Sequence, residues 1–276
     1  MDFSVAICAH NASRTISAVL DAALLQNPVP NEVVVIDDGS TDSTAKIVSQ
    51  FTNVRLITLP ENVGIAVARN RAIEESKHDL IIFIDADAVV KPNCFEALLK
   101  HASNSDVAAI SGRGEEFYRY DFSNRFRALH APQSLSSEPI EDAPMFMGLC
   151  FAIRKGIAQK VGGFDPKFRT NGEDADMSFR IKKAGFKIYY EPTAVVEHLK
   201  FDGFFGIVFQ RFRFGYWMMR ALKKNRVPSG WFIKPATKNL VGNGINRLKR
   251  LKLKEAAMFF ALYLAQISGM ATGFFG

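Results

Sequence analysis

Short apolar runs rich in valine and isoleucine alternate along the chain with longer segments in which apolar residues recur every three or four positions. The runs lie at 3–8, 33–36, 54–59, 80–84 and 107–110. Runs of this length are typical of buried strands, and the segments between them of amphipathic helices. Because each helix carries the chain back to the edge where the previous strand began, the alternation predicts an α/β fold with a mainly parallel sheet.

The pattern is less regular beyond residue 110. The segment 113–144 is polar with scattered aromatic residues, and we expect it to cross over the sheet and to help form a substrate cleft. Further strands are predicted at 145–153 and 186–190, with a helix between them that begins near Asp174 and ends near Gly185. We therefore expect a catalytic domain over residues 1–200 and a C-terminal helical extension over 201–276.

Acidic residues follow two of the predicted strands. Asp37 and Asp38 end the second, and Asp85 and Asp87 follow the fourth. The carboxyl ends of parallel strands meet at one sheet edge, where α/β proteins bind ligands. Side chains two residues apart on a strand point to one side, about 6–7 Å apart, so a divalent cation would relieve the repulsion between Asp85 and Asp87. Oxygen ligands suit Mg²⁺ or Mn²⁺, although a solvated acidic turn would have the same sequence.

A helix that follows the third strand brings Arg69 to the same edge. A guanidinium there can neutralise the charge of a phosphate. The alternative is an arginine on the solvent side of the helix.

Six sequence motifs follow one another along the chain. They are VAICAHN, VVVIDDGSTD, NVGIAVARN, IIFIDADA, GGFD and NGEDADMSFRIKKAGFKIYYEPTAVVEH. Together, over residues 3–198, they resemble the motifs of the family-two inverting glycosyltransferases. The resemblance implies the GT-A fold, a Rossmann-like, mainly parallel sheet flanked by helices. It also implies a metal-dependent enzyme that moves a sugar from a nucleotide-diphosphate donor to an acceptor hydroxyl.

The resemblance assigns roles to individual residues. Contacts with the nucleotide-sugar are implied for Ala9, His10, Asn11, Asp38, Arg69 and Asp85. Asp87 is implied as the principal ligand of Mg²⁺ or Mn²⁺, with Asp85 and His198 as further ligands. Asp174 is implied as the catalytic base, because displacement at the anomeric carbon needs a carboxylate that takes the proton of the acceptor hydroxyl. Glu173 either orients the acceptor or is a charge at the start of a helix.

The motif after the first strand departs from the family pattern. Cys8, Ala9 and His10 stand where many relatives carry a hydroxyl residue and an aromatic residue before the asparagine. This departure leaves the base of the donor nucleotide open.

The composition is that of a globular protein, with 48% hydrophobic and 23% charged residues and a net charge of +7. The charge is unevenly distributed: Lys200 to Glu255 holds 14 basic and two acidic residues, a net charge of +12, so the rest of the chain carries −5. Such a tail indicates an anionic partner. The three cysteines lack pair spacing, and the N-terminus lacks a signal peptide, so a cytoplasmic location is expected.

The tail combines this charge with apolar residues. Residues 201–226 mix aromatic side chains with arginine and lysine, which is typical of a helix at a membrane interface. Residues 256–276 are uncharged over 21 positions, about 31 Å as a helix and close to the thickness of a bilayer. Gly269 and Gly273 have the spacing of a close helix contact. We expect association with the inner face of the cell membrane, either peripheral, which is favoured, or through a single C-terminal span.

The acceptor partner is then expected to be a glycan or a lipid-linked sugar. Packing of the C-terminal helix on the catalytic domain, or a homodimer through the C-terminal helices, is the alternative arrangement. A nucleic-acid partner is not expected, because it would leave the acidic residues at the sheet edge unexplained.

Two alternative enzyme classes would need motifs after the first strand that this chain lacks. A sugar-phosphate nucleotidyltransferase would need a Gly-rich basic loop after the first strand, where CAHNASRT stands. A dehydrogenase would need Gly-x-Gly-x-x-Gly at the same place. A non-catalytic scaffold with a transferase fold stays open.

Overall fold

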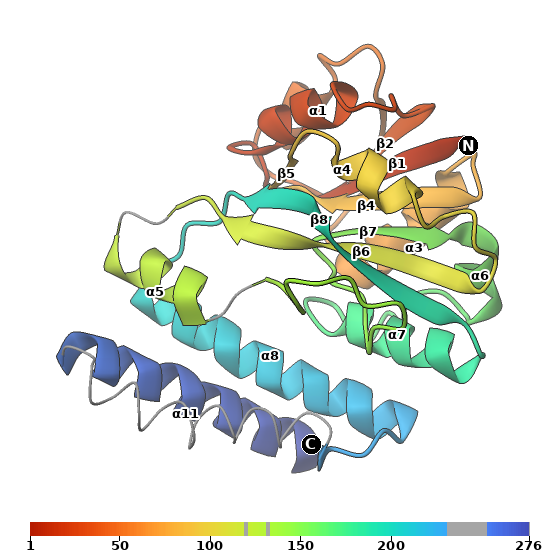
Figure 1. The fold of residues 1–276 in the computed structure, drawn as a ribbon. Helices are drawn as coiled ribbons and strands as arrows, with labels where there is room; N and C mark the ends of the chain where they lie inside the picture. The colour runs from red at the N-terminus through yellow and green to blue at the C-terminus, as the bar shows by residue number, and fades with distance from the viewer. Residues whose placement is uncertain (119–120, 131–132, 231–252, 276) are drawn as a thin grey trace. The chain divides into compact units, whose positions relative to one another are not determined.

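The computed structural model describes residues 1–118, 121–130, 133–230 and 253–275, and the chain forms two compact units (Figure 1). The first unit comprises Met1–Tyr118 and Pro132–Lys200, and the second comprises Arg119–Ala131 and Phe201–Gly276. The segment 119–131, which the sequence analysis assigned to the catalytic domain, therefore belongs to the second unit. The physical reason is that its apolar side chains pack in a cluster with residues of the C-terminal helices.

The first unit is built on one eight-stranded sheet with the strand order β3-β2-β1-β4-β7-β6-β8-β5. The strands are β1 (Phe3–Ala9), β2 (Glu32–Asp37), β3 (Arg55–Thr58), β4 (Leu80–Asp85), β5 (Ala88–Val90), β6 (Val107–Glu116), β7 (Cys150–Arg154) and β8 (Lys187–His198). Strands β1 to β4 pair in parallel, as do β6 and β8. β7 is antiparallel to both of its neighbours, and β5 is antiparallel to β8. The predicted α/β fold with a mainly parallel sheet is confirmed.

Helices cover both faces of this sheet. They are α1 (Ile16–Leu24), α2 (Thr44–Val48), α3 (Ile65–Glu75), α4 (Cys94–Leu99), α6 (Lys155–Lys160) and α7 (Glu173–Lys183). Phe3, Val5 and Ile7 of β1 pack in one core cluster with residues of α1 and α4. Ala6, between them, packs in the other cluster with residues of α3 and α7. Because both faces are buried, the strands appear in the sequence as continuous apolar runs.

Two strands extend well beyond the apolar runs that predicted them. β6 continues to Glu116 and β8 to His198, and the two pair in parallel as far as these last residues. The extension of β6 passes through the polar sequence GRGEE, whose backbone is held by pairing with β8. The pairing brings the side chains of Glu116 and His198 together at the carboxyl edge of the sheet.

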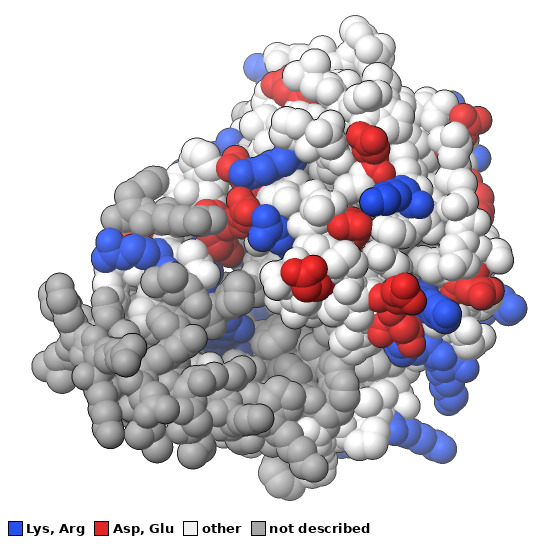
Figure 2. Space-filling view, viewed as in Figure 1, with Lys and Arg blue, Asp and Glu red and all other residues white. Residues whose placement is uncertain are grey.

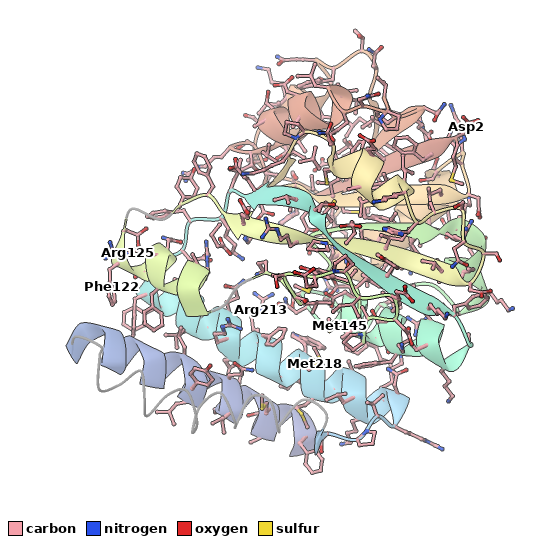
Figure 3. The ribbon with its side chains drawn as sticks, in the orientation of Figure 1. Asp2, Phe122, Arg125, Met145, Arg213 and Met218 are labelled. Atoms are coloured by element: carbon pink, nitrogen blue, oxygen red, sulfur yellow. The ribbon has the colours of Figure 1, made fainter. Side chains whose placement is uncertain are left out.

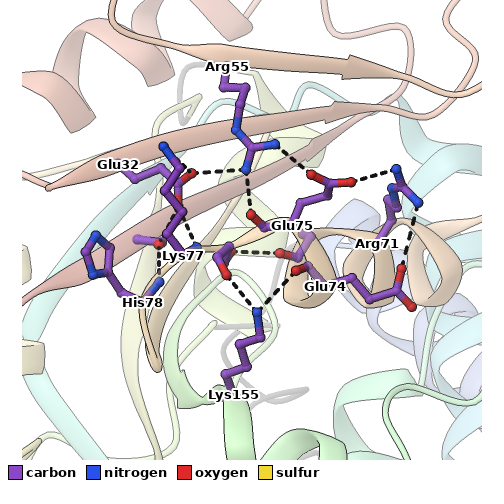
Figure 4. Close-up of polar contacts among 11 residues, drawn as sticks. Glu32, Arg55, Arg71, Glu74, Glu75, Lys77, His78 and Lys155 are labelled. Atoms are coloured by element: carbon purple, nitrogen blue, oxygen red, sulfur yellow. Dashed lines mark hydrogen bonds and ion pairs between the residues drawn. The ribbon is translucent and has the colours of Figure 1, made fainter.

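The amino edge of the sheet carries a cluster of ion pairs and hydrogen bonds (Figure 4). Glu32, the first residue of β2, accepts hydrogen bonds from Ser4 Oγ at 2.7 Å, from the Lys77 amide at 2.8 Å and from Arg55 at 3.0 Å. Burial acts to raise the pKa of Glu32, but these donors outweigh it and lower the pKa. Arg55 also pairs with Glu75 at the end of α3. The cluster ties the start of the sheet to α3, on the edge opposite to the predicted site.

The second unit contains α5 (Phe122–His130), α8 (Phe204–Asn225) and α11 (Leu253–Phe275). Phe122 on α5 belongs to an apolar cluster with residues of α8 and α11 (Figure 3). Helices α8 and α11 run parallel and touch through glycines: a side chain at Gly269 would collide with the carbonyl oxygen of Phe212, and one at Gly273 with that of Tyr216. The close contact that the glycine spacing predicted is confirmed.

In the part of the chain that the structure describes, no helix combines the length and apolar character that crossing a bilayer requires. The single C-terminal span was one of the two arrangements predicted from the sequence, and no helix among these residues matches it.

Candidate active site

The predicted site residues gather at the carboxyl edge of the sheet. The carboxyl ends of β1, β2, β4, β6 and β8 lie there, together with the amino end of β7, because β7 runs against its neighbours. Ala9, Asp85 and His198 are the last residues of β1, β4 and β8. His10 and Asp38 directly follow β1 and β2, and Asn11 and Asp87 are the second residues after β1 and β4. Glu173 and Asp174 begin α7, and Arg69 lies on α3.

Arg69 joins the end of β4 to the start of α7. One guanidinium nitrogen lies 2.7 Å from Glu173 Oε1, and the other lies 2.9 Å from Asp85 Oδ1 and donates to the carbonyl oxygen of Gly148 at 2.8 Å. The guanidinium lies over the rings of Phe151 and Phe164. Only 2% of the residue is exposed. In this structure the guanidinium of Arg69 therefore pairs with carboxylates of the protein. The contact of Arg69 with a diphosphate stays a prediction.

The position of Arg69 has a local cause in α3. Ala66, Ala72 and Ile73 form the buried side of the helix, and Arg69 lies between them on the same side. The helix therefore buries the arginine along with its apolar stripe, and the arginine needs carboxylate partners there.

The carboxylates around Arg69 differ in their surroundings. Burial raises the pKa of Glu173 to about 7, and the neighbouring Asp174 adds to this effect, while Arg69 opposes it. Burial raises the pKa of Asp85 to about 6, with Arg69 opposing and Asp87 contributing. Burial also raises the pKa of Asp174, again opposed by Arg69. The pKa values of these three carboxyl groups are thus all higher than those of free carboxylates.

Asp174 is the more accessible of the two acids that begin α7. It is partly exposed, whereas Glu173 is buried. Asp174 Oδ2 accepts a hydrogen bond from the Gly148 amide at 3.2 Å, and Oδ1 accepts one from the Ala175 amide at 2.8 Å. A side chain at Gly148 would place its Cβ 3.0 Å from Asp174 Oδ2 and 3.5 Å from Arg69 Nη2. The absence of a side chain at position 148 therefore leaves room for Asp174 and Arg69.

His198 faces Asp87 and Glu116. Its Nε2 lies 3.5 Å from Asp87 Oδ2, and its Nδ1 lies 3.2 Å from Glu116 Oε1. Burial acts to lower the pKa of His198, but the two carboxylates outweigh it and raise the pKa to about 9. Burial likewise acts to raise the pKa of Asp87, yet His198 lowers it. Glu116 thus orients the imidazole so that its other nitrogen points toward Asp87.

The predicted metal ligands can be tested against this geometry. Asp87 and His198 present an oxygen and a nitrogen to each other, while Asp85 is turned toward Arg69. Within residues 1–118, 121–130, 133–230 and 253–275, no three His, Cys, Asp or Glu side chains are arranged to hold a metal ion. Mg²⁺ characteristically takes one or two carboxylates and completes its coordination with substrate phosphates and water. The donor set therefore fits a divalent cation that binds together with a phosphate-bearing ligand.

The residues predicted to contact the nucleotide hold two loops together. Asp38 accepts hydrogen bonds from the amides of Val63 and Gly64 at 2.8 and 3.0 Å. Asn11 has a φ of 52° and accepts from the Thr41 amide at 2.9 Å, and His10 Nδ1 contacts the carbonyl oxygen of Asp38 at 2.8 Å. Asp38 is 4% exposed. Its carboxylate thus shapes the loop before α3, and direct contact with a base stays a prediction for Asp38, His10 and Asn11.

Sequence reasoning missed two groups at this edge, Glu116 and the backbone of Gly148. Glu116 was missed because β6 extends to residue 116, whereas the apolar run that predicted this strand ends at residue 110. Gly148 acts through its amide and carbonyl groups, for which the sequence MGLC carries no chemical signature.

The chain is similar in sequence to known proteins. A family model described as "Glycosyl transferase family 2" matches residues 4–162. The glucosyl-dolichyl phosphate glucuronosyltransferase of Haloferax volcanii is 25% identical over 240 residues, which cover 78% of this chain and 76% of that protein. The pre-mycofactocin glycosyltransferase of Mycobacterium tuberculosis is 28% identical over 174 residues, 60% of this chain. The match spans 37% of that relative's length.

Solved structures share the fold. A mannosyltransferase from Pyrobaculum calidifontis, in complex with GDP-Man and Mn²⁺, superposes with a TM-score of 0.69 at 19% identity, over 97% of this chain and 86% of that one. The GalNAc-T7 structure with UDP, GalNAc and Mn²⁺ gives a TM-score of 0.63 at 17% identity, over 81% and 48% of the two chains. The predicted GT-A-like fold is confirmed by these similarities.

Proposed function

The chain belongs to glycosyl transferase family 2, and from this premise we propose that it transfers a sugar from a nucleotide-diphosphate donor to an acceptor hydroxyl with inversion at the anomeric carbon. The observation that carries the proposal is the bridge made by Arg69. It links Asp85, beside the candidate metal ligand Asp87, to Glu173, beside the candidate base Asp174. A donor held at the end of β4 would therefore lie next to a proton acceptor at the start of α7.

In this proposal Asp174 takes the proton from the acceptor hydroxyl as that oxygen attacks the anomeric carbon. Its partial exposure lets it reach an acceptor, and its raised pKa brings it closer to the pH at which a general base works best. The amide of Gly148 keeps one carboxylate oxygen in place. Glu173, which is buried and bonded to Arg69, acts as a positioning residue that sets the start of α7.

The proposal includes a divalent cation, Mg²⁺ or Mn²⁺. Asp87 and His198 would hold it, with Asp85 close by, and His198 would lose the proton on its Nε2 when the cation binds. The cation would stabilise the negative charge of the departing diphosphate. The Pyrobaculum mannosyltransferase, which shares the fold, was solved with GDP-Man and Mn²⁺. Glu116 would act on the cation indirectly, by orienting the His198 ring.

We further propose that the acceptor is a glycan, carried on a lipid. The Haloferax relative is named for transfer to a glucosyl-dolichyl phosphate. An O-antigen chain rhamnosyltransferase of Salmonella anatum is 27% identical over 188 residues, 63% of this chain. The nucleotidyltransferase considered from the sequence does not agree with the family match.

The test begins with donor binding. Nucleotide-sugars are screened for thermal stabilisation of the protein with Mn²⁺ present, which identifies base and sugar without an acceptor. Release of nucleoside diphosphate is then measured for the wild type, for Asp174→Asn and for a control, Asp142→Asn, at an exposed carboxylate paired with Lys182.

We expect Asp174→Asn to keep donor binding and to lose turnover by a factor of about 10² or more, while the control stays active. Full turnover by Asp174→Asn would show that Asp174 is not the catalytic base. If the wild-type protein binds donors but shows no turnover, the result would favour the alternative of a non-catalytic scaffold with a transferase fold.

A further inference from the structure

Helix α11 has two different sides. The side that packs on α8 is formed by Gly269, Gly273 and the buried residues Leu262 and Met270. The opposite side carries the exposed apolar residues Leu264, Ile267, Ala271 and Phe274, beside the exposed but uncharged Ser268 and Thr272, and we call the four apolar residues the outer face of α11. Leu264 is 64% exposed, Phe274 48% and Ile267 39%.

The outer face is unusual for a helix in contact with water. The exposed side of a surface helix is normally polar or charged. From Ala256 to Gly276 the sequence holds no charged residue. The face extends from residue 264 to 274, about 15 Å along the helix. An apolar stripe of this length indicates that something other than water covers it.

Exposed aromatic residues also occur at the start of α8. Phe205 is 83% exposed and Phe209 59% exposed. They lie on successive turns of α8 and continue in the same row as Phe212 and Tyr216, whose rings lie 6.5 Å apart. Both helices of the second unit therefore present bulky apolar side chains outward.

The charge of the segment decides which partner fits. Residues 201–276 hold 13 basic residues and two acidic ones. On α8 there are five basic residues and no acidic one. A second copy would bring the same positive charge to the contact, which disfavours self-association. By contrast, Figure 2 shows both signs of charge interspersed on the visible face of the first unit.

We propose that the outer face of α11 and the exposed phenylalanines of α8 dock on the surface of a membrane that contains anionic lipid. Apolar side chains would enter the boundary between headgroups and acyl chains, and lysines and arginines would meet the headgroup charge. In the sequence, five basic residues from Arg247 to Lys254 directly precede the uncharged stretch. The inference stands on the second unit alone, so it can hold or fail independently of the transfer reaction.

The test uses the full-length chain and vesicles. Flotation is compared with vesicles of phosphatidylcholine alone and with vesicles in which roughly a third of the lipid is phosphatidylglycerol. We expect binding to the anionic vesicles that weakens with salt. The variant Leu264→Ser/Ile267→Ser should bind at least about tenfold more weakly, since two large apolar side chains no longer enter the lipid.

A matched control changes exposed apolar residues of the first unit. Leu25 and Val29 are 84% and 65% exposed, and Leu25→Ser/Val29→Ser should bind as the wild type does. Circular dichroism and thermal unfolding establish that each variant is folded. A second variant, Phe205→Ser/Phe209→Ser, tests the surface without touching α11.

Three results would overturn the proposal. The first is no binding of the wild type to either vesicle. The second is equal binding to neutral and anionic vesicles. The third is a wild-type dimer in sedimentation velocity that the Leu264→Ser/Ile267→Ser variant lacks, which would make a second copy the occupant. Turnover of a soluble acceptor by the same variants, measured separately, reports on the transfer reaction.

Discussion

Replacing Arg69 with methionine removes a buried charge while keeping most of the side-chain volume. The guanidinium makes two ion pairs and one hydrogen bond to a carbonyl, at 2.7, 2.9 and 2.8 Å. Without it, Glu173 becomes a buried carboxylate without a countercharge, and its Oε2 atom already lacks a hydrogen-bond partner among the described residues. We expect Arg69→Met to destabilise the fold strongly and to disturb both ends of the proposed site.

The magnitude follows mainly from Glu173. Its side chain is 7% exposed, whereas that of Asp85 is 34% exposed and can be solvated by water. Removing one partner of a buried ion pair costs about 3–5 kcal/mol. Protonation sets the part of this cost that depends on pH: the wild type already carries much of the cost of neutralising Glu173, because the folded pKa of about 7 lies above the ordinary 4.5, so the extra cost in the variant is about 1 kcal/mol at pH 7.5 and close to zero at pH 5.5. The loss in Arg69→Met should therefore shrink by about 1 kcal/mol between these two pH values.

The assay is urea unfolding followed by circular dichroism at pH 7.5 and pH 5.5. The control is Arg71→Met on the same helix, because Arg71 is 45% exposed and pairs with Glu75 at 2.6 Å. An exposed pair of this kind contributes about 0–1 kcal/mol. Equal losses for the two variants, or a loss in Arg69→Met that does not depend on pH, would refute the idea that Arg69 neutralises a buried Glu173.

Four further predictions concern single positions. Glu173→Gln removes a group whose folded pKa of about 7 lies above its ordinary 4.5, so the loss of stability on raising the pH from 4.5 to 7 should be smaller than in the wild type; equal slopes in thermal unfolding would contradict this. Gly148→Val should lower turnover at least about tenfold while donor-induced thermal stabilisation persists, because its side chain crowds the catalytic carboxylate; wild-type turnover would show that the spacing is not critical. Glu32→Gln should lose about 1–3 kcal/mol at pH 7 in urea unfolding. Since the pKa of Glu32 is lowered, this difference should narrow as the pH falls below 4.5, and a constant difference would speak against the assignment. Asp87→Asn should weaken Mn²⁺ binding at least about tenfold in calorimetry with the donor present, and unchanged affinity would exclude Asp87 as a ligand.

The sequence determined the order and type of the elements in the first unit. β1, β2 and β4 are apolar on both sides because helices cover both faces of the sheet, and this burial produces the runs from which they were predicted. Parallel pairing then brings the ends of these strands to one edge. The positions of Asp38, Asp85 and Asp87 at that edge follow from local pattern alone.

The tertiary structure alone decided the partners of these residues. Arg69 contacts Asp85 and Glu173, which lie 16 and 104 positions away in the sequence, and neither distance leaves a trace in a local pattern. Glu116 reaches His198 because β6 pairs with β8 through polar residues, which a search for apolar runs passes over. Secondary structure follows from the burial of neighbouring side chains, whereas ion pairs between distant segments depend on how strands are ordered in space, and one sequence does not encode that order in any short stretch.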